Sequence, residues 1–426
     1  MAKTFREWDV DQVWLFPPSV RDFVPDGHIA HFIRDTVCEE LDLSEILNCY
    51  SVERGYPPYH PVMMTALLLY SYCQGVYSSR RVARACEQRV DFMAVTGMNK
   101  PDFRTVADFR KKHLKALKGL FIQVLRLCQR AGLVTLGHVA LDGTKIKANA
   151  SKHKAMSYGR MGKAEGELKA EVDKWFTEAD AVDRAEDEEH GMDRRGDEMP
   201  EWVANKQKRL EKIREAKAAL EAEAKQKAKV EGKKEHKPDD KAQKNFTDPE
   251  SRIMKTGNGF EQCYNAQAAV DAKCQIIVAQ TLTNAANDKQ QLDPMLSEIK
   301  QNMGCHADEI SADAGYCSED NLKQVNRRHV NAYVATGRQK HGEAAATGDK
   351  SSRVGTRVHA MMVKLKQGGH RSRYRLRKQT VEPVFGQIKQ ARGFRQFLMR
   401  GTDNVAGEWA MICIAHNLLK LAMAST

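Results

Sequence analysis

Five short runs of strand-like sequence, and the order in which they occur, constrain the fold of this chain more than any other feature. The runs cover residues 136–149, 259–272, 275–285, 309–316 and 331–337. A helix predicted from Asp288 to about Gln301 separates the third run from the fourth, and another helix separates the last two. Three strands followed by helix–strand–helix–strand imply a mixed sheet covered by helices, and so an α+β fold. The apolar segment WAMICIAHNLLKLAMA (409–424) predicts a closing helix that packs on this sheet.

The first 132 residues have the pattern of several short helices. Pro61 fits the first position of one helix, and Gly75 and Gly132 fit the ends of two. Short helices joined by polar turns suggest a small bundle, which is either a helix-turn-helix DNA reader or simply a bundle, and the sequence leaves both open. We expect a helical DNA-binding domain at 1–132 and a sheet domain at 136–426.

A long charged block interrupts the sheet domain at residues 151–245. Ala, Glu and Lys dominate it, with thin apolar stripes at helical spacing. This pattern predicts two exposed helices that pair as an antiparallel arm. The alternative is a partly disordered, solvated insertion.

Positive charge is concentrated near the end of the chain. From Ser351 to Arg400 there are thirteen Lys or Arg residues and a single acid, Glu382, whereas the whole chain carries a net charge of +12. Everything outside this window is therefore nearly neutral. Such a basic window predicts a polyanionic partner.

Several classes of protein are excluded by the cysteine and hydropathy patterns. The ten cysteines include no CxxC motif and no Cys/His cluster at zinc spacing, so we expect reduced thiols packed in a cytosolic core. The N-terminus has no apolar run after its charges, and no signal peptide is predicted. The two longest apolar stretches, 63–73 and 409–424, are too short to span a membrane. These patterns predict a cytoplasmic protein without a membrane partner.

Three carboxylates occupy unusual positions. Asp142 lies inside the apolar strand VALDGTKI, and Asp313 ends the buried-looking strand of ISADAGY. An acid within an apolar strand is costly unless something compensates it. Glu382 is predicted at a helix start, with Thr380 as N-cap, Pro383 in the first turn, and the helix running to about Arg392. The plainer alternatives are a strand-end cap for each Asp and a favourable helix-dipole contact for Glu382.

Together these acids suggest a metal site. Mg²⁺ prefers hard oxygen ligands and is usually held by a few carboxylates plus substrate phosphate. Two ions about 4 Å apart can activate an attacking oxygen and stabilise a leaving one. The basic residues around Glu382 would then hold a nucleic-acid backbone. On the helix of Glu382, Lys389 lies two turns further along the same flank.

Several blocks of the chain resemble the DDE transposases of bacterial insertion sequences, in the large group related to insertion sequence five. The blocks are the N-terminal segment from HPVMMTALLLYSYCQG to FRTVADFRKKH, VALDGTKIKANAS, TDPESRIMKTGNGFEQCYNAQAAVD, ADAGYCSEDN and YRLRKQTVEPVFGQIK. This resemblance implies an RNase H-like fold with Asp142, Asp313 and Glu382 as the catalytic, metal-binding triad. It further implies two divalent ions, Mg²⁺ or Mn²⁺, at that triad.

The resemblance also implies a Tyr–Arg–Glu–Lys signature around the glutamate. Tyr374, Glu382 and Lys389 fit it, but four residues separate Arg377 from Glu382 where the signature has three, which leaves the Arg position open between Arg377 and Lys378. The residues expected to bind DNA are Tyr374, Arg377, Lys389, Arg392, Lys145, Arg80, Arg81 and Arg84. The implied partners are double-stranded DNA, at element ends and at the target, and a second copy of the chain on that DNA. The implied location is the bacterial cytoplasm, at the nucleoid.

Three other functions compete with a transposase. A nuclease of the same fold would cut without strand transfer, and a transposase-derived DNA-binding protein would have lost catalysis. Intact carboxylates at all three positions weigh against the second of these. A coiled-coil scaffold organised by residues 160–235 explains neither the strand acids nor the basic window.

Overall fold

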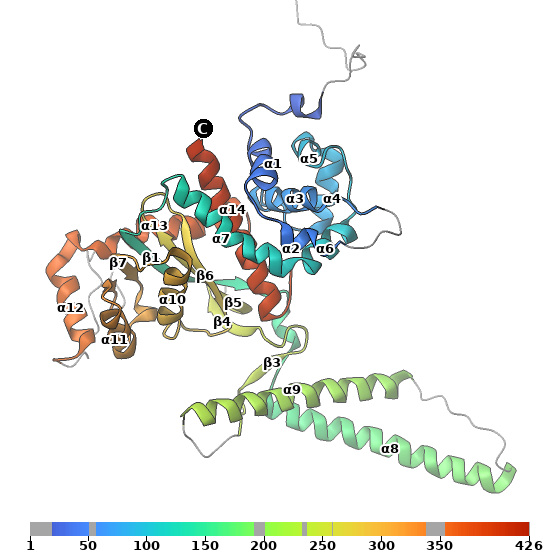
Figure 1. Cartoon of the computed structure of the whole chain (residues 1–426). Coiled ribbons are helices and arrows are strands. Elements are labelled where there is room, and N and C mark those ends of the chain that lie inside the picture. Colours follow the sequence, from blue (N-terminus) through green and yellow to red (C-terminus); the bar gives the residue numbers. More distant parts are fainter. Residues whose placement is uncertain are drawn as a thin grey trace, which may run out of the picture.

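A mixed β-sheet forms the centre of the computed structural model, which describes residues 19–50, 57–190, 201–231, 237–257, 259–337 and 354–425 (Figure 1). Within these residues the sheet has six strands: β1 (His138–Lys147), β4 (Arg252–Thr256), β5 (Gly259–Asp271), β6 (Ile277–Thr283), β7 (Glu309–Ala312) and β8 (Asn331–Val334). Their spatial order is β4–β5–β1–β7–β8, and β6 also pairs with β5. The α+β class predicted from the strand order is confirmed.

Strand β1 is central to the sheet and sets the register of its neighbours. It runs antiparallel to β5 and parallel to β7. In the parallel pair Leu141 lies opposite Ala312, the last residue of β7. The residue after each of these two is an aspartate, Asp142 on β1 and Asp313 beyond β7. Pairing of the backbone alone therefore brings two acids that are far apart in sequence to neighbouring positions.

The helices that follow β6 in the chain cover the sheet. After β6 come α10 (Leu292–Met303), α11 (Glu319–Arg327), α12 (Arg357–Gly368), α13 (Leu376–Gly386) and α14 (Thr402–Ser425). The Asn417 side chain on α14 accepts from the backbone N–H of Ile277 and donates to its carbonyl, both at 2.9 Å. The expected closing helix thus packs on the sheet, although it begins at Thr402. Across the described ranges, no helix combines the length and apolarity needed to cross a membrane.

The N-terminal region is a helical bundle joined to the sheet through α14. Its helices are α1 (Ile29–Glu39), α2 (Ser44–Leu47), α3 (Pro61–Cys73), α4 (Ser79–Gln88), α5 (Val90–Thr96), α6 (Phe103–Lys112) and α7 (Leu114–Arg130). One hydrophobic core runs from these helices through Trp409 and Ile412 of α14 to Val270 and Ile277 in the sheet. Helix α14 contacts α7 and α3 of the bundle on one side and β6 of the sheet on the other (Figure 1). The boundary expected at 132–136 is therefore crossed by shared packing, and the division into domains stays a prediction.

The charged block forms the predicted arm. A short ribbon of β2 (Ala155–Ser157) and β3 (Gln243–Asn245) leads into α8 (Tyr158–His190) and α9 (Glu201–Glu231), which project from the molecule (Figure 1). Glu165 on α8 accepts from Arg214 at 3.0 Å and Lys217 at 2.9 Å on α9. A small separate cluster of Met161, Ile213 and Leu220 packs between the helices. The antiparallel pairing is confirmed for the described residues.

The helix that carries Glu382 differs from the prediction. Helix α13 begins at Leu376, so Glu382 and Pro383 lie within it and Thr380 is buried in it instead of capping it. An interior proline leaves the carbonyl four residues earlier without its helical donor. Here that carbonyl, on Gln379, accepts from the Gln275 side chain at 2.9 Å. Residues Gln387–Ala391 continue as a π-helix, a form often found at functional sites.

A close approach between α7 and α14 predicts a strong effect of one added methyl group. A Cβ at Gly407 would lie 2.6 Å from Leu114 Cγ on α7. We expect Gly407→Ala to lower the free energy of unfolding by about 1–3 kcal/mol, because overpacking forces side chains out of their rotamers. Urea denaturation followed by circular dichroism measures this.

A glycine on α7 provides the control. A Cβ at the exposed Gly119 would meet nothing within 4 Å. Gly119→Ala should be neutral or stabilise by up to about 1 kcal/mol, because alanine favours a helix. Equal effects of the two substitutions would show that α7 and α14 do not pack closely here.

Candidate active site

Asp142 is held in the middle of β1 with little access to solvent. Its side chain is 14% exposed. The Oδ1 atom accepts from the backbone N–H of Gly143 at 2.9 Å, and Oδ2 forms an ion pair with Arg377 Nη2 at 2.7 Å. The buried strand thus carries a compensated acid.

Asp313 follows β7 directly and both caps a turn and faces the site. Its Oδ1 accepts from the backbone N–H of Gly315 at 2.9 Å, at the start of the short 3₁₀ helix Ala314–Tyr316. The capping explanation is therefore correct for this residue. It does not exclude a role in the site, because the charge of Asp313 also acts on Asp142.

Arg377 connects the third acid to the first. While Nη2 pairs with Asp142, Nη1 donates to Glu382 Oε1 at 3.0 Å. The Glu382 side chain is 47% exposed, whereas that of Arg377 is 12% exposed. One guanidinium therefore bridges β1 and α13, and the acids gather around it.

Electrostatics at the site reflect burial opposed by this arginine. Burial is the main cause that raises the pKa of Asp142 to about 6; Arg377 opposes the rise and Asp313 adds to it. Burial also raises the pKa of Asp313, against Arg377 and with a further contribution from Asp288. Burial alone would lower the pKa of Arg377, but Asp142 and its other neighbours raise it overall. Ionisation of both aspartates is therefore unfavourable here, and a nearby cation would stabilise the ionised forms.

The donors fit a divalent cation in their chemistry. Asp142, Asp313 and Glu382 offer the hard carboxylate oxygens that Mg²⁺ and Mn²⁺ accept. Within the described ranges, however, no three His, Cys, Asp or Glu side chains are close enough to hold an ion as they stand. Arg377 lies between Asp142 and Glu382. An ion shared by these two carboxylates requires Arg377 to give up at least one of its ion pairs.

Sequence reasoning missed a further carboxylate, Asp288, whose charge acts on Asp313. Asp288 was expected to open a helix, but α10 begins at Leu292 with Gln291 as N-cap, and Asp288 stands in the loop before it. Its Oδ1 accepts from the side-chain amides of Asn265 and Gln267, each at 2.7 Å. Asn265 and Gln267, two buried polar residues on one face of strand β5, are the signal that could have pointed to a buried partner.

Lys389 contacts β1 at Lys145, three residues after Asp142. Its ammonium donates to the carbonyl of Lys145 at 2.9 Å, and burial lowers the pKa of Lys389. The charge of Asp142 also reaches it. The structure thus brings Lys389 and Lys145 together near the acids, as their predicted shared role requires; DNA contact by either stays a prediction.

Two other residues expected to bind DNA are buried. Tyr374 packs with Leu365 and Ala335. Arg392 is 9% exposed and lies against His416, with its Nη2 3.4 Å from His416 Nδ1. Both side chains are therefore covered by protein in this conformation, which favours a structural role. Arg80, Arg81 and Arg84, by contrast, are exposed on α4.

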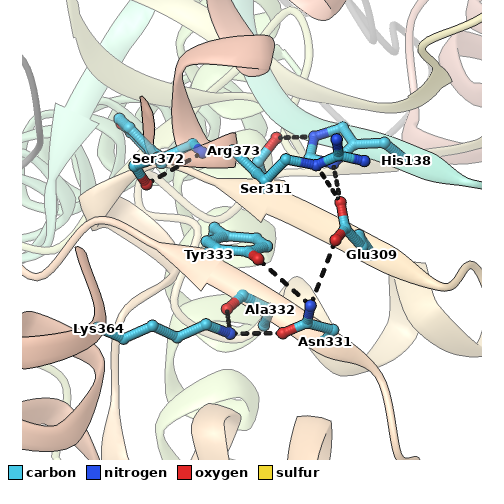
Figure 2. Close-up of polar contacts among 10 residues, drawn as sticks. His138, Glu309, Ser311, Asn331, Ala332, Tyr333, Lys364, Ser372 and Arg373 are labelled. Atoms are coloured by element: carbon cyan, nitrogen blue, oxygen red, sulfur yellow. Dashed lines mark hydrogen bonds and ion pairs between the residues drawn. The ribbon is translucent and has the colours of Figure 1, made fainter. Parts of the chain in front are cut away.

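A polar network at the other end of the parallel strands anchors the segment that leads into α13. Figure 2 shows Glu309 of β7 between His138 of β1 and Arg373, with Asn331 of β8 on its second oxygen. Arg373 donates to Glu309 Oε2 at 2.7 Å, and His138 Nδ1 lies 3.3 Å from the same atom. Although partial burial opposes the change, Arg373 and His138 lower the pKa of Glu309. Because Arg373 is four residues before Arg377, this network helps to fix the backbone position from which the Arg377 side chain reaches Asp142 and Glu382.

Two family models match parts of this chain. Residues 18–112 match a family model described as Transposase domain (DUF772), and residues 226–418 match one described as Transposase DDE domain. The second match includes Asp288, Asp313 and Glu382 and begins after Asp142. No match was found among curated proteins, and none among solved structures. Both matched models agree with the resemblance noted in the sequence.

Removal of the bridging guanidinium should change how stability depends on pH. The folded-state pKa of Asp142 lies above its ordinary value, so the stability tied to its protonated form is lost as pH rises through about 6. Arg377→Ala should move that pKa higher still. Between pH 6 and 8 we expect the variant to lose up to about 1.4 kcal/mol more per pH unit than wild type. Urea unfolding at pH 5, 6, 7 and 8 measures this.

Lys378→Ala is the matched control, because it removes the same charge from the adjacent, exposed position of α13. Its stability should follow the wild-type pH profile. Parallel profiles for Arg377→Ala and Lys378→Ala would mean that Arg377 does not govern the ionisation of Asp142.

Proposed function

Since this chain is a DDE transposase of the insertion-sequence type, we propose that it cuts DNA at the ends of its element and joins the cut strand to a target. The observation that supports the proposal is the pair of ion pairs through which Arg377 joins Glu382 to Asp142. Asp313 follows the strand that pairs with β1, and its charge acts on Asp142. Phosphoryl transfer on DNA needs such a set of carboxylates from separate segments at one point.

DDE transposases generally use divalent metal ions. When bound, two such ions would activate the attacking oxygen and stabilise the leaving oxygen. We assign Asp142, Asp313 and Glu382 as the residues that hold them, as Mg²⁺ or Mn²⁺. Glu382 is half-exposed and lies on a helix, so it can reorient when Arg377 releases it.

Arg377 has a second role in this proposal. Its planar guanidinium keeps Asp142 ionised and oriented while no metal is bound. Once displaced by a cation, the same group can form paired hydrogen bonds with a phosphate, which is the geometry that arginine favours. Arg377 would then exchange a carboxylate for the DNA backbone.

A basic groove offers a path for that backbone beyond the acids. It has a volume of about 500 Å³ and is lined by Lys147, Lys152, Lys154 and Arg400, with Glu261 as its acid. Lys147 follows Asp142 by five residues on β1, roughly 17 Å along the strand, a rise of about five base pairs. We propose that DNA runs from the acids past Lys145 and Lys389 into this groove.

The N-terminal helices supply a candidate surface for recognising the ends. Arg80, Arg81 and Arg84 are exposed on α4, and the Arg80 guanidinium stacks over Phe103 at 5.2 Å. An element has two ends, so we propose that two copies of the chain act together on DNA, at the nucleoid in the cytoplasm. A nuclease of the same fold would use the same acids, and only strand-transfer products distinguish the two functions.

The chemical step is tested with isosteric substitutions. Asp142→Asn, Asp313→Asn and Glu382→Gln should each lower Mg²⁺-dependent cleavage of an end-containing duplex by about a thousandfold or more, because each removes several kcal/mol of charge stabilisation. Affinity for the duplex should change little. Gel-resolved cleavage and strand-transfer products, with binding measured by fluorescence anisotropy, report both properties.

Asp308→Asn is the control, since Asp308 is an exposed acid on the segment that leads into β7. It should cut at the wild-type rate. Cleavage by Asp142→Asn at the wild-type rate would contradict the assignment. Cleavage by the wild-type protein without any strand-transfer product would indicate a nuclease.

Substitutions in the basic groove and on α4 should affect DNA binding in different ways. Alanine at Lys152 and Lys154 should weaken end DNA and unrelated DNA equally and reduce the salt dependence by about 0.9 for each phosphate that the protein no longer neutralises. Alanine at Arg80, Arg81 and Arg84 should instead reduce the preference for end DNA. Binding titrations of both duplexes at several salt concentrations measure these effects.

Alanine at Lys163 and Lys169, two exposed lysines of α8, matches the charge change of the groove variant. This pair should keep the wild-type salt slope. An equal decrease of the slope in both double variants would mean that net charge, and not the groove, sets affinity. Unchanged discrimination in the α4 variant would assign those arginines another role.

A further inference from the structure

We propose that helix α9 of the charged arm binds the DNA backbone beside the basic groove, so that the arm lengthens the stretch of duplex held by one copy of the chain. The inference rests on the proposed function, because it continues the same DNA path. Its basis is a second hollow of about 530 Å³, the arm hollow, between residues 205–213 of α9 and the ribbon of β2 and β3. Figure 1 shows this ribbon where the arm leaves the sheet domain.

The arm hollow adjoins the basic groove. His153 and Lys154 line both of them. These two residues belong to the short 3₁₀ helix Lys152–Lys154, which comes directly before β2. A DNA strand that follows the groove past Lys154 would therefore reach α9.

The charges of α9 are sorted by the side of the helix on which they lie. Residues 205–213 include four cations and one acid. Lys206 forms an ion pair with Glu171 of α8 at 2.5 Å. The acid, Glu211, does not line the arm hollow, and no other Asp or Glu of the described residues does. The remaining three cations all line it: Lys208, Arg209 and Lys212.

Cations on the two sides of α9 also differ in their partners. Further along the helix, Arg214 and Lys217 both pair with Glu165 of α8. The three cations of the arm hollow are exposed and form no ion pair with any described residue. Lys208 and Lys212 lie one turn apart, where like charges destabilise a helix. The side of α9 that faces α8 is thus neutralised within the arm, and the side that faces the hollow is left for an anionic partner.

The apolar floor of the arm hollow needs no partner of its own. Ile213 belongs to the small core of the arm, and Met156 and Phe246 pack against that core. The partner is therefore identified by the basic rim. Four residues of helix, from Lys208 to Lys212, span about 6 Å. This is close to the rise of about 7 Å between a phosphate and the second one after it on the same DNA strand.

A row of phosphates fits this rim, and the neighbouring groove favours DNA as its source. The competing occupant is an acidic segment of a second copy of the chain. Because the groove and the arm hollow share Lys154, one duplex can occupy both. Each further phosphate that the protein neutralises releases counterions, so DNA on α9 makes affinity more dependent on salt.

The test measures this salt dependence with the full chain and a series of end-containing duplexes of increasing length. Alanine at Lys208, Arg209 and Lys212 should lower the slope on the longest duplexes by about 0.9 for each phosphate no longer neutralised, or about 2–3 in total. The slope on the shortest duplexes should not change. Circular dichroism checks the fold, which alanine at exposed helix positions should preserve. Fluorescence anisotropy at several salt concentrations gives the slopes.

Two controls separate position from charge. Alanine at Lys163, Lys169 and Lys225 removes the same charge from exposed positions of the arm outside both hollows, and this variant should keep the wild-type slopes. Arginine at Lys208 and Lys212 keeps the charge of the rim and should also keep them. Loss of slope in the alanine variant of the rim alone supports the proposal.

The contrary outcomes are distinguishable. Wild-type slopes in the rim variant, with a lowered slope in the Lys152 and Lys154 variant, overturn the role of α9 and leave the groove. Wild-type slopes in both overturn the whole DNA path. Equal losses in the rim variant and its control overturn the proposal, because net charge would then set affinity. If the rim variant keeps its slopes but loses self-association in sedimentation without DNA, a second copy occupies the arm hollow, which also overturns it.

Discussion

The ion pairs of Arg377 are the interaction on which the rest of the site depends. One guanidinium joins Asp142 on a central strand to Glu382 on a helix about 240 residues later in the chain. Without it, burial would favour protonated aspartates, because burial already raises the pKa of Asp142 to about 6. The arginine therefore keeps the acids ionised and close together, which is the state a divalent cation requires. Arg377 lies between the two carboxylates, so under the proposed function metal binding would require Arg377 to be released.

The fold positions this arginine from two sides. At one end of the parallel strands Glu309 anchors Arg373, four residues before Arg377 (Figure 2). On the other side Gln275 donates to the helix carbonyl that Pro383 leaves without a donor, so that α13 can run past a proline and present Glu382. Asn417 of α14 holds β6 at Ile277, close in sequence to Gln275. The packing of α14 against the N-terminal bundle thus supports the helix that carries the third acid.

Much of this arrangement could be predicted from sequence, and the failures have physical causes. Strand periodicity and an acid in an apolar run located Asp142 and Asp313, because the cost of burying charge makes such residues stand out. The start of the helix that carries Glu382 was predicted too late in the sequence. Gln275, which donates to the carbonyl that Pro383 leaves without a donor, is remote in sequence and could not be foreseen. Asp288 was missed because only the fold shows that Asn265 and Gln267 point at it. Burial of Arg392 was equally invisible, as it depends on the distant His416.

The most direct test of this account is anomalous diffraction from crystals of the full chain grown with an end-containing duplex and Mn²⁺. The account predicts anomalous density between Asp142 and Asp313, with Glu382 within ligand distance and Arg377 moved off Asp142 toward a phosphate. Mn²⁺ bound elsewhere, with the Arg377 ion pairs to Asp142 and Glu382 unchanged on bound DNA, would contradict it.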